Sequence, residues 1–454
     1  MGTEVTVCKN TLRVLMFPWQ AYGHINPFLR VAKKLVDRGF LIYVLSTKVN
    51  LKLTKKKIPE KYQPSIQLIE LHLHLLPELP SHLHTTNGLP PALNHVLRKA
   101  LKMAKPNLSK ILSNLKPDLV ISDFLQQWSS QVANEQGIPQ VGLLTSGAAV
   151  LSYMFNLVKK PGFEFPFEAI RLRKNEKEKM SEALAQSAKD KEPDGLDPFA
   201  DANMNIMLMS TSRVIEAKYI DYLQKLANWK VVPVGTPVRD ASACDYDEKE
   251  LIDWLGKKPP NSTVFVSFGS EYFLSKRTRE EIAFGLELSN VNFIWVARFP
   301  KGEEQSLIDA LPPGFTERAG DRGRVVTKFA PQLRILNHPS TGGFISHCGW
   351  NSVMESVDAG VPIIAMPIHL DQPMNARLIV ELGVAVEIVR RDGGSIHREE
   401  IAKIIKDVIS SKSGENLKRK MADLAKLLKA ARDEEMTTAA EELIRLCKNS
   451  PKTN

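Results

Sequence analysis

The fold is decided by residues 329–372, which read FAPQLRILNHPSTGGFISHCGWNSVMESVDAGVPIIAMPIHLDQ. Two short apolar segments, Gly343–Ser346 and Ile363–Met366, predict buried parallel strands. Between them lie a turn of small and polar residues, 347–352, and a helical segment that ends at Gly360. The order of strand, turn, helix and strand directs backbone N–H groups and the positive end of a helix dipole toward one point beyond the sheet. The stretch therefore predicts an anion site, most often one for phosphate.

Polar side chains at the same places could bind a ligand. His347, Asn351 and Ser352 can donate to phosphate oxygens, and the carboxylate and amide of Asp371 and Gln372 can bind hydroxyls. Each also has an ordinary structural interpretation, because Asn and Ser cap helices and a His at a strand end is usually just hydrogen-bonded. A strand–turn–helix pattern alone is a weak indication of a nucleotide site.

The N-terminal residues repeat the rhythm of strand, helix and strand. The apolar run Leu12–Phe17 predicts a buried strand, and Leu41–Leu45 predicts the next one. Between them we expect a helix with Asn26 as its N-cap and Pro27 as its first residue. In such a βαβ unit the first loop lies at the carboxyl edge of the sheet, where ligands bind. This topology places His24 at a functional edge.

A third strand is predicted just before Asp123, which places this carboxylate at the same sheet edge as His24. A lone Asp at a strand end is usually a helix cap. Asp118 is the alternative carboxylate, but it precedes the strand and so belongs to the opposite edge. An anionic carboxylate beside an imidazole fixes the imidazole tautomer and stabilises the imidazolium.

Composition is that of an ordinary globular chain of 454 residues, with 43% hydrophobic and 25% charged residues. The length predicts two domains of roughly 200 residues each. We place the first domain at residues 1–235, a linker at 236–250 and the second domain at 251–430. Residues 431–454 are expected to form a helix and tail, the helix packing back on the first domain.

Charge and hydropathy argue against several partners. The net charge is +10, but the basic residues lie in short dispersed clusters, so no nucleic-acid partner is expected. No apolar run approaches the ~18 residues of a membrane helix, and the N-terminus lacks the apolar segment of a secretion signal. The cysteines are far apart, which suits a reducing cytosol: Cys8, Cys244, Cys348 and Cys447. We therefore expect a cytoplasmic protein without stable membrane insertion.

Two further patterns are weak. The N-terminus fits a loose myristoylation pattern through Gly2 and Thr6, in which chance matches are common, so lipidation of Gly2 stays open. Four histidines also lie close together, but without a nearby cluster of other ligands: His72, His74, His82 and His84. No metal site is predicted there.

Over its full length, the stretch 329–372 resembles the C-terminal signature box of plant UDP-sugar-dependent glycosyltransferases of secondary metabolism. The HCGWNS run, Glu355, AGVP and the closing DQ all match. The segment Gly23–Pro27 resembles the first catalytic loop of that family, and residues 117–123, PDLVISD, match a further segment. The resemblance covers nearly the whole chain and is strongest at 263–390.

The resemblance implies a role for each matching residue. His24 is the general base and Asp123 is its partner. The uracil and ribose contacts fall on Phe329, Ala330, Gln332 and Glu355. The diphosphate contacts fall on Ser270, His347, Asn351 and Ser352. The sugar contacts fall on Thr145, Trp350, Asp371 and Gln372. The family usually carries Trp where Phe329 stands, so uracil would stack on a smaller ring here.

The resemblance also implies an α/β fold of the GT-B class, in which two Rossmann-like domains with parallel sheets face each other across a cleft. It implies an inverting transfer from a UDP-sugar, with UDP-glucose favoured by Gln372, to a small-molecule acceptor. UDP-sugar is a co-substrate, and we expect no cofactor, no metal and a monomer.

Three segments resemble the branch that lengthens the sugar chain of an existing glycoside through 1→2 or 1→6 links: HLHTTNGLPP at 82–91, FGSEYF at 268–273 and IHLDQ at 368–372. The expected acceptor is a flavonoid or triterpenoid glycoside. First-step O-glucosylation of an aglycone and a non-catalytic nucleotide-sugar binder are the alternatives. An NAD dehydrogenase is disfavoured because no G-x-G-x-x-G follows the first strand.

Overall fold

The computed structural model describes residues 11–189, 205–235, 246–269, 273–298, 311–327, 330–391 and 394–449. Two predicted donor contacts, Ser270 and Phe329, and most of the expected linker lie outside the described residues. The chain groups into two compact units, one of residues 1–164, 185–237 and 430–454 and one of residues 165–184 and 238–429. Residues 165–184, which we expected in the first domain, therefore group with the second unit.

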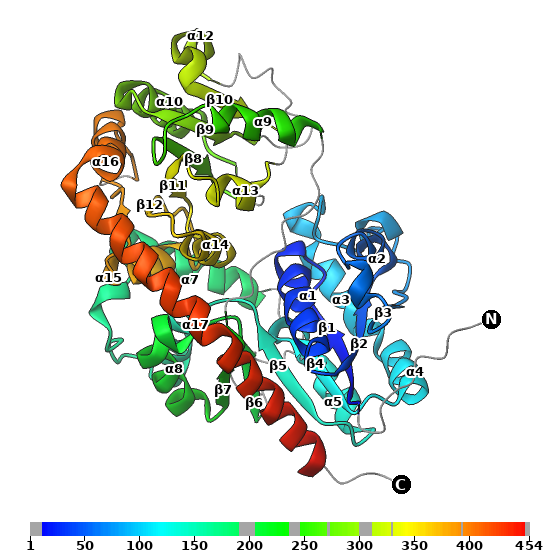
Figure 1. The fold of residues 1–454 in the computed structure, drawn as a ribbon. Coiled ribbons are helices and arrows are strands. Elements are labelled where there is room, and N and C mark those ends of the chain that lie inside the picture. The colour runs from blue at the N-terminus through cyan, green and yellow to red at the C-terminus, as the bar shows by residue number, and fades with distance from the viewer. Residues whose placement is uncertain are drawn as a thin grey trace. The chain divides into compact units, whose positions relative to one another are not determined.

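The first unit contains a parallel sheet of seven strands. The strands are β1 (Arg13–Phe17), β2 (Leu41–Ser46), β3 (Ile66–Glu70), β4 (Leu119–Asp123), β5 (Gln140–Leu144), β6 (Ile206–Met209) and β7 (Lys230–Pro233). Their order in the sheet is β3-β2-β1-β4-β5-β6-β7 (Figure 1). The order reverses between β1 and β4, so the loops after these two strands meet at a topological switch point.

The helices of the first unit are α1 (Tyr22–Val36), α2 (Lys48–Lys55), α3 (Asn94–Met103), α4 (Lys105–Leu115), α5 (Trp128–Asn134), α6 (Ala148–Lys159) and α8 (Arg213–Ala227). Residues of β1 alternate between two cores. Val14 and Met16 share a core with α1 and the end of α17 (Lys412–Asn449), whereas Leu15 and Phe17 share one with α3, α4 and α5. Both faces of the strand are buried, which explains its continuous apolar run.

Helix α1 begins earlier than the sequence predicted. Its first residue is Tyr22 and its N-cap is Ala21, so Pro27 lies inside the helix. Asn26, the predicted N-cap, lies within the helix, and its side-chain oxygen accepts a hydrogen bond from Lys57 Nζ at 2.9 Å. Proline inside a helix removes one backbone hydrogen bond and crowds the carbonyl four residues before it. Against this cost, the added turn buries Ile25 in the core. As a consequence, His24 stands on the first turn of α1.

The second unit contains a parallel sheet of six strands, in the order β10-β9-β8-β11-β12-β13. The strands are β8 (Thr263–Ser267), β9 (Asn292–Val296), β10 (Gly323–Val326), β11 (Thr341–Ser346), β12 (Ile363–Ala365) and β13 (Ala385–Glu387). The helices are α9 (Tyr246–Gly256), α10 (Lys276–Ser289), α12 (Phe315–Ala319), α13 (Gln332–Leu336), α14 (Trp350–Ala359), α15 (Gln372–Glu381) and α16 (Arg398–Ser410). The switch point lies between β8 and β11, so the loops after them share one edge.

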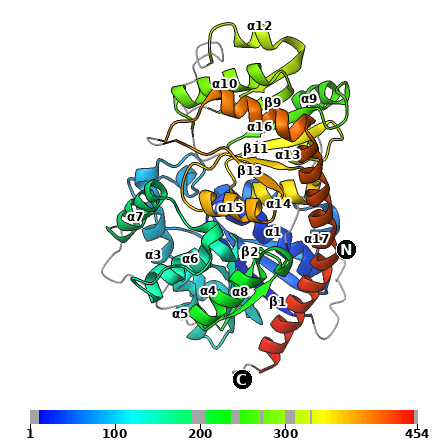
Figure 2. The ribbon, with the colours of Figure 1, turned by 90° about the vertical axis from the view of Figure 1, so that its left-hand side faces the viewer.

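The described C-terminal region forms two helices, α16 and α17. After α16, helix α17 runs unbroken for 38 residues (Figure 2). Its residues 415–449 contain neither Gly nor Pro, so nothing in the sequence interrupts the helix. Part of α17 belongs to the second unit, and from Ala430 its residues belong to the first.

An ion-pair network fastens residues 165–184 to the second unit. Arg173 binds Glu387 with two hydrogen bonds, of 2.6 and 2.9 Å. Arg377, on α15, is 7% exposed and donates to the Glu176 carboxylate and, at 2.6 Å, to the Arg171 carbonyl. Charges withdrawn from water need such pairing.

Arg377→Met is expected to lower the free energy of unfolding by about 3 kcal/mol, because the buried carboxylate of Glu176 keeps only a 3.4 Å ion pair with Arg173 and the Arg171 carbonyl loses its donor. Urea denaturation of the variant measures this loss. The matched control is Arg419→Met, which removes an arginine from an ion pair whose side chains are both 68% exposed. That change should alter stability by less than about 1 kcal/mol. Equal effects of the two substitutions would contradict this account of the network.

Candidate functional site

His24 and Asp123 form a close pair in the first unit. The distance from His24 Nδ1 to Asp123 Oδ2 is 2.8 Å. Asp123 is 1% exposed, and its other oxygen accepts the Leu125 N–H at 3.0 Å, so the carboxylate is held from both sides. A carboxylate only accepts hydrogen bonds, so the pair places the imidazole proton on Nδ1. The opposite nitrogen, Nε2, is then the basic one.

Sheet topology brings these two residues together. In the register of the parallel pair β1–β4, Phe17 lies opposite Ser122, so the segments that follow both strands leave the sheet side by side. Thr145 follows β5, the next strand, and its Oγ1 lies 3.4 Å from His24 Nδ1. Asp118 lies at the other end of β4, where it accepts the backbone N–H of Arg13 at 2.8 Å. The geometry therefore pairs His24 with Asp123 and not with Asp118.

In the second unit, the turn after β11 packs against the turn after β8. The His347 ring lies against two glycines: a β-carbon at position 349 would be 2.6 Å from its Nε2, and one at position 269 would be 2.8 Å from it. Gly269 also has φ +77°, a conformation that side chains disfavour. Both positions must therefore be glycine for the ring to fit.

His347 is a neutral donor, not a cation, at physiological pH. Burial, together with the nearby His369, lowers the pKa of His347 from 6.5 to about 4. A neutral imidazole still carries one N–H, and the backbone of Ser267 is a hydrogen-bond partner of the ring. Any diphosphate bound here would thus be met by dipoles and not by a positive charge on His347.

The low pKa of His347 predicts a pH dependence of stability. Between pH 6.5 and about 4 the unfolded chain binds a proton that the folded state excludes, so stability falls as the pH falls through this window. The loss is at most about 3 kcal/mol. His347→Asn should flatten this part of the curve when unfolding free energies are measured from pH 4 to 7. Identical slopes for the variant and the natural chain would contradict the shifted pKa.

The start of α14 carries several predicted donor contacts. Asn351 and Ser352 lie in its first turn, whose N-cap, Gly349, supplies no side-chain cap. Gln332 Nε2 donates to Glu355 Oε2 at 2.8 Å and lies 3.4 Å from Ser352 Oγ. The structure therefore brings Gln332, Ser352 and Glu355 together along the first half of α14. Two further predicted contacts, Ala330 and Trp350, are close to these residues in sequence, and both are buried.

The predicted sugar contacts Asp371 and Gln372 lie where α15 begins. The Gln372 side chain is already engaged within its own loop: its Oε1 accepts the N–H groups of Ile368 and His369 at 3.1 and 3.2 Å. Its Nε2 lies 3.1 Å from His369 Nδ1. The Asp371 carboxylate accepts from Asn375 at 2.8 Å. Asn375, which lies beyond the stretch 329–372, was not among the predicted site residues.

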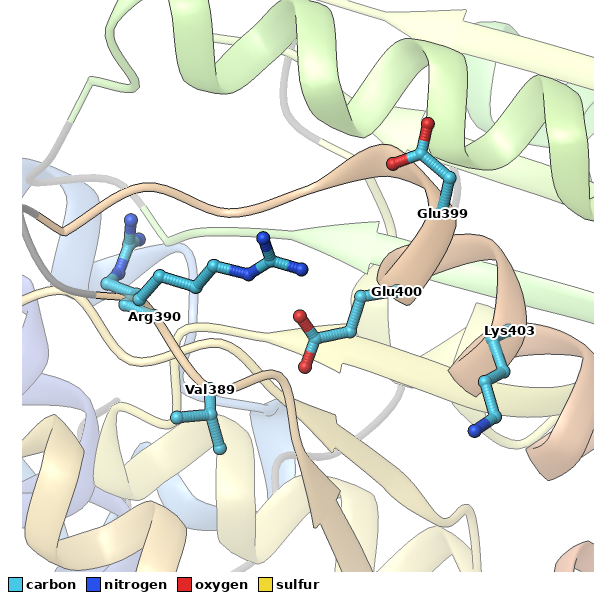
Figure 3. A pocket seen from close by; sticks show the side chains of 6 residues that line it. Val389, Arg390, Glu399, Glu400 and Lys403 are labelled. Carbon is cyan, nitrogen blue, oxygen red and sulfur yellow. The ribbon is translucent and has the colours of Figure 1, made fainter.

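Other surface features lie apart from these residues. An open depression of about 550 Å³ is lined by side chains of mixed charge, none of them a predicted site residue: Val389, Arg390, Arg391, Glu399, Glu400 and Lys403 (Figure 3).

Within the described part of the chain, no three His, Cys, Asp or Glu side chains gather as metal ligands would. Among the described helices, none is both long and apolar enough to span a membrane.

Comparison with known proteins agrees with this geometry. Residues 245–430 match the family described as UDP-glucoronosyl and UDP-glucosyl transferase, and residues 10–235 match the glycosyltransferase N-terminal domain. The chain belongs to this family and is a UDP-sugar-dependent glycosyltransferase with the GT-B fold, as the sequence predicted.

Its relatives span nearly the whole chain. The β-D-glucosyl crocetin β-1,6-glucosyltransferase of Gardenia jasminoides is 52% identical over 95% of this chain and 98% of its own. The cyanidin-3-O-glucoside 2-O-glucuronosyltransferase of Bellis perennis is 41% identical over 97% and 98%. Among solved structures, Phytolacca americana UGT2 complexed with UDP-2fluoro-glucose and pterostilbene has a TM-score of 0.74, with 27% identity over 97% of this chain and 100% of that one.

Proposed function

We propose that this enzyme transfers glucose from UDP-glucose to a hydroxyl of a sugar already attached to a plant natural product, a flavonoid or a triterpenoid, through a 1→2 or 1→6 link. Two relatives support this proposal, because the names of the Gardenia and Bellis enzymes specify acceptors that already carry a sugar, with 1,6 and 2-O linkages. The single observation that carries the chemistry is the 2.8 Å contact between His24 and Asp123.

In the proposed reaction, His24 Nε2 removes the proton from an acceptor hydroxyl while that oxygen forms a bond to the anomeric carbon of the donor. The bond from this carbon to UDP breaks, and UDP leaves with the electron pair. Attack on the face opposite UDP inverts the anomeric centre through a transition state that resembles an oxocarbenium ion. Asp123 stabilises the imidazolium that forms on His24.

Charge that develops on the leaving diphosphate needs preorganised donors. We assign this role to the backbone N–H groups at the start of α14, the neutral His347, and the side chains of Asn351 and Ser352. Asp371 and Gln372 are assigned to hydroxyls of the transferred sugar. The arrangement requires no metal ion, and activity should persist in excess EDTA.

The test is an assay of UDP-glucose with paired acceptors, each pair being an aglycone and its monoglucoside, with products identified by mass spectrometry. Addition of one hexose to the monoglucosides is expected. Products from aglycones alone would reject glycoside extension in favour of first-step glucosylation. UDP binding without transfer to any acceptor would favour the non-catalytic alternative.

We further propose that the enzyme acts as a monomer in the cytosol. The wide spacing of its cysteines supports a reducing compartment, and the described cysteines Cys348 and Cys447 carry free thiols. Light scattering of the purified chain should give a mass near 50.8 kDa, and about twice that mass would contradict the monomer.

A further inference from the structure

Asn375 lies in the first turn of α15, with no exposed surface, and contacts both ends of the predicted donor site in the second unit. Its Nδ2 donates to the carbonyl of Cys348 at 3.0 Å and to Asp371 Oδ2 at 2.8 Å. Cys348 belongs to the turn assigned to the diphosphate, and Asp371 is assigned to the sugar. One amide group therefore joins the two parts of the donor site.

The orientation of this amide is fixed by chemistry. A backbone carbonyl and a carboxylate both only accept hydrogen bonds, so the amide nitrogen must face them. The Asn375 Oδ1 is then buried, and it has no partner among the described residues. A buried acceptor without a partner is unfavourable. The site thus retains an amide at the cost of one unsatisfied oxygen, which points to a need for its two N–H donors.

The bond to Cys348 controls the direction of the diphosphate turn. Cys348 has φ +63°, which is uncommon for a residue other than glycine. Its peptide N–H donates to Ser346 Oγ at 3.1 Å, and Asn375 holds its carbonyl. In a trans peptide the carbonyl and the next N–H point in opposite directions. Holding this carbonyl toward Asn375 therefore directs the Gly349 N–H away from Asn375, at the start of α14.

The bond to Asp371 orients the sugar-binding carboxylate. The loop before Asp371 is held by Gln372 through the backbone N–H groups of Ile368 and His369, and Leu370 adopts φ +54°. Asn375 engages one carboxylate oxygen of Asp371 and so limits rotation of that side chain. The carboxylate is thereby held in one orientation, in which it can accept a hydrogen bond from a sugar hydroxyl.

We propose that Asn375 is a positioning residue that couples the diphosphate turn to the sugar-binding Asp371, so that the donor site recognises the nucleotide and the sugar as one rigid unit. This inference rests on the proposed function of the second unit as the UDP-glucose site. It assigns Asn375 no contact with the substrate itself.

The test measures the affinities of UDP and UDP-glucose by calorimetry for Asn375→Leu and Asn375→Asp. Asn375→Leu keeps the side-chain volume but loses both donors, and it should bind UDP-glucose about tenfold to hundredfold more weakly at every pH. Asn375→Asp places a carboxylate against two other acceptors, the Cys348 carbonyl and the Asp371 carboxylate. At pH 8 this variant should bind UDP-glucose as weakly as Asn375→Leu does. At pH 5 its affinity should recover toward that of the natural chain, because a proton shared with Asp371 restores one donor.

Each affinity is divided by that of the natural chain at the same pH, so that effects of pH unrelated to position 375 cancel. The matched control is Asn156→Leu, which removes a 1%-exposed amide from α6 in the first unit. It should leave UDP-glucose affinity unchanged. If Asn375→Leu folds poorly, the comparison of UDP-glucose affinity of Asn375→Asp at pH 8 and pH 5 still tests the coupling role.

Two results would overturn the coupling role: a folded Asn375→Leu variant with natural affinity for UDP-glucose, or an Asn375→Asp variant whose relative affinity is the same at both pH values. If the natural chain itself bound neither UDP nor UDP-glucose, the proposed function would fail first. The two failures are therefore distinguishable.

Discussion

His24→Ala should lower kcat by about 10²–10⁴-fold, because the acceptor oxygen then attacks without a general base. The side chain stands on the first turn of α1, and its assigned role is to take the acceptor's proton and not to bind the donor, so the fold and the KM for UDP-glucose should change little. Steady-state kinetics with a monoglucoside acceptor, together with a thermal-denaturation curve, measure both effects.

Two carboxylates near the same strand supply the control. Asp123→Asn should also remove most activity, because the imidazolium loses its countercharge and the amide offers only one acceptor oxygen. The carboxylate uses two, one for His24 Nδ1 at 2.8 Å and one for the Leu125 N–H at 3.0 Å. Asp118→Asn, at the opposite end of β4, should retain natural activity. Near-natural turnover by a folded His24→Ala enzyme, or equal losses from both aspartate substitutions, would refute the assignment of the base.

Gly349→Ala is expected to reduce kcat/KM for UDP-glucose by about 100-fold. The added β-carbon would lie 2.6 Å from His347 Nε2, and the same ring atom is close to Gly269, where a β-carbon would lie 2.8 Å from it. The clash should displace His347 and the turn, and this would misalign the N–H donors at the start of α14. Small misplacements of groups in such sites lower the reaction rate strongly. Kinetics with varied UDP-glucose measure the change.

A second substitution separates this clash from a general loss of stability. In His347→Ala/Gly349→Ala the ring is absent, so the added methyl group fits, and the double variant should behave like His347→Ala alone. Gly256→Ala is the matched control, because its β-carbon would lie 3.9 Å from the ring of another histidine, His338. Additive losses in the double variant would show that the clash with His347 is not the cause.

The sequence predicted the architecture because strands buried on both faces leave continuous apolar runs. The runs at β1 and β11 are of this kind, and each is followed by a loop with small and polar residues. The order of elements therefore predicted which loops lie at the carboxyl edge of each sheet. At the two switch points the structure places His24 beside Asp123 and His347 beside Gly269. Confirmation of the fold and family came with the comparisons.

Features that depend on packing were not predictable from local signals. Pro27 is a strong signal for a helix start, yet burial of Ile25 extends α1 by a further turn. The alternating segment 71–75 resembles a strand, but β3 ends at Glu70 because pairing with β2 ends there, at Ser46. Asn375 lies beyond the signature box, and only its contacts in the folded chain identify it.

The long-range ion pairs of residues 165–184 were equally hidden. Arg173 and Glu387 are separated by more than 200 residues in the chain, and Arg173 is one of many dispersed charges. A solvated surface is the usual meaning of such a charge. Only the tertiary structure shows that this segment groups with the second unit.

The central claim is that a hydroxyl of an acceptor sugar, activated by His24, displaces UDP with inversion. The most direct measurement is an NMR spectrum of the product formed from UDP-α-glucose and a monoglucoside acceptor. We expect a new β-linked glucosyl group on the existing sugar. An α-linked product, or a glucosyl group attached only to the aglycone, would contradict it.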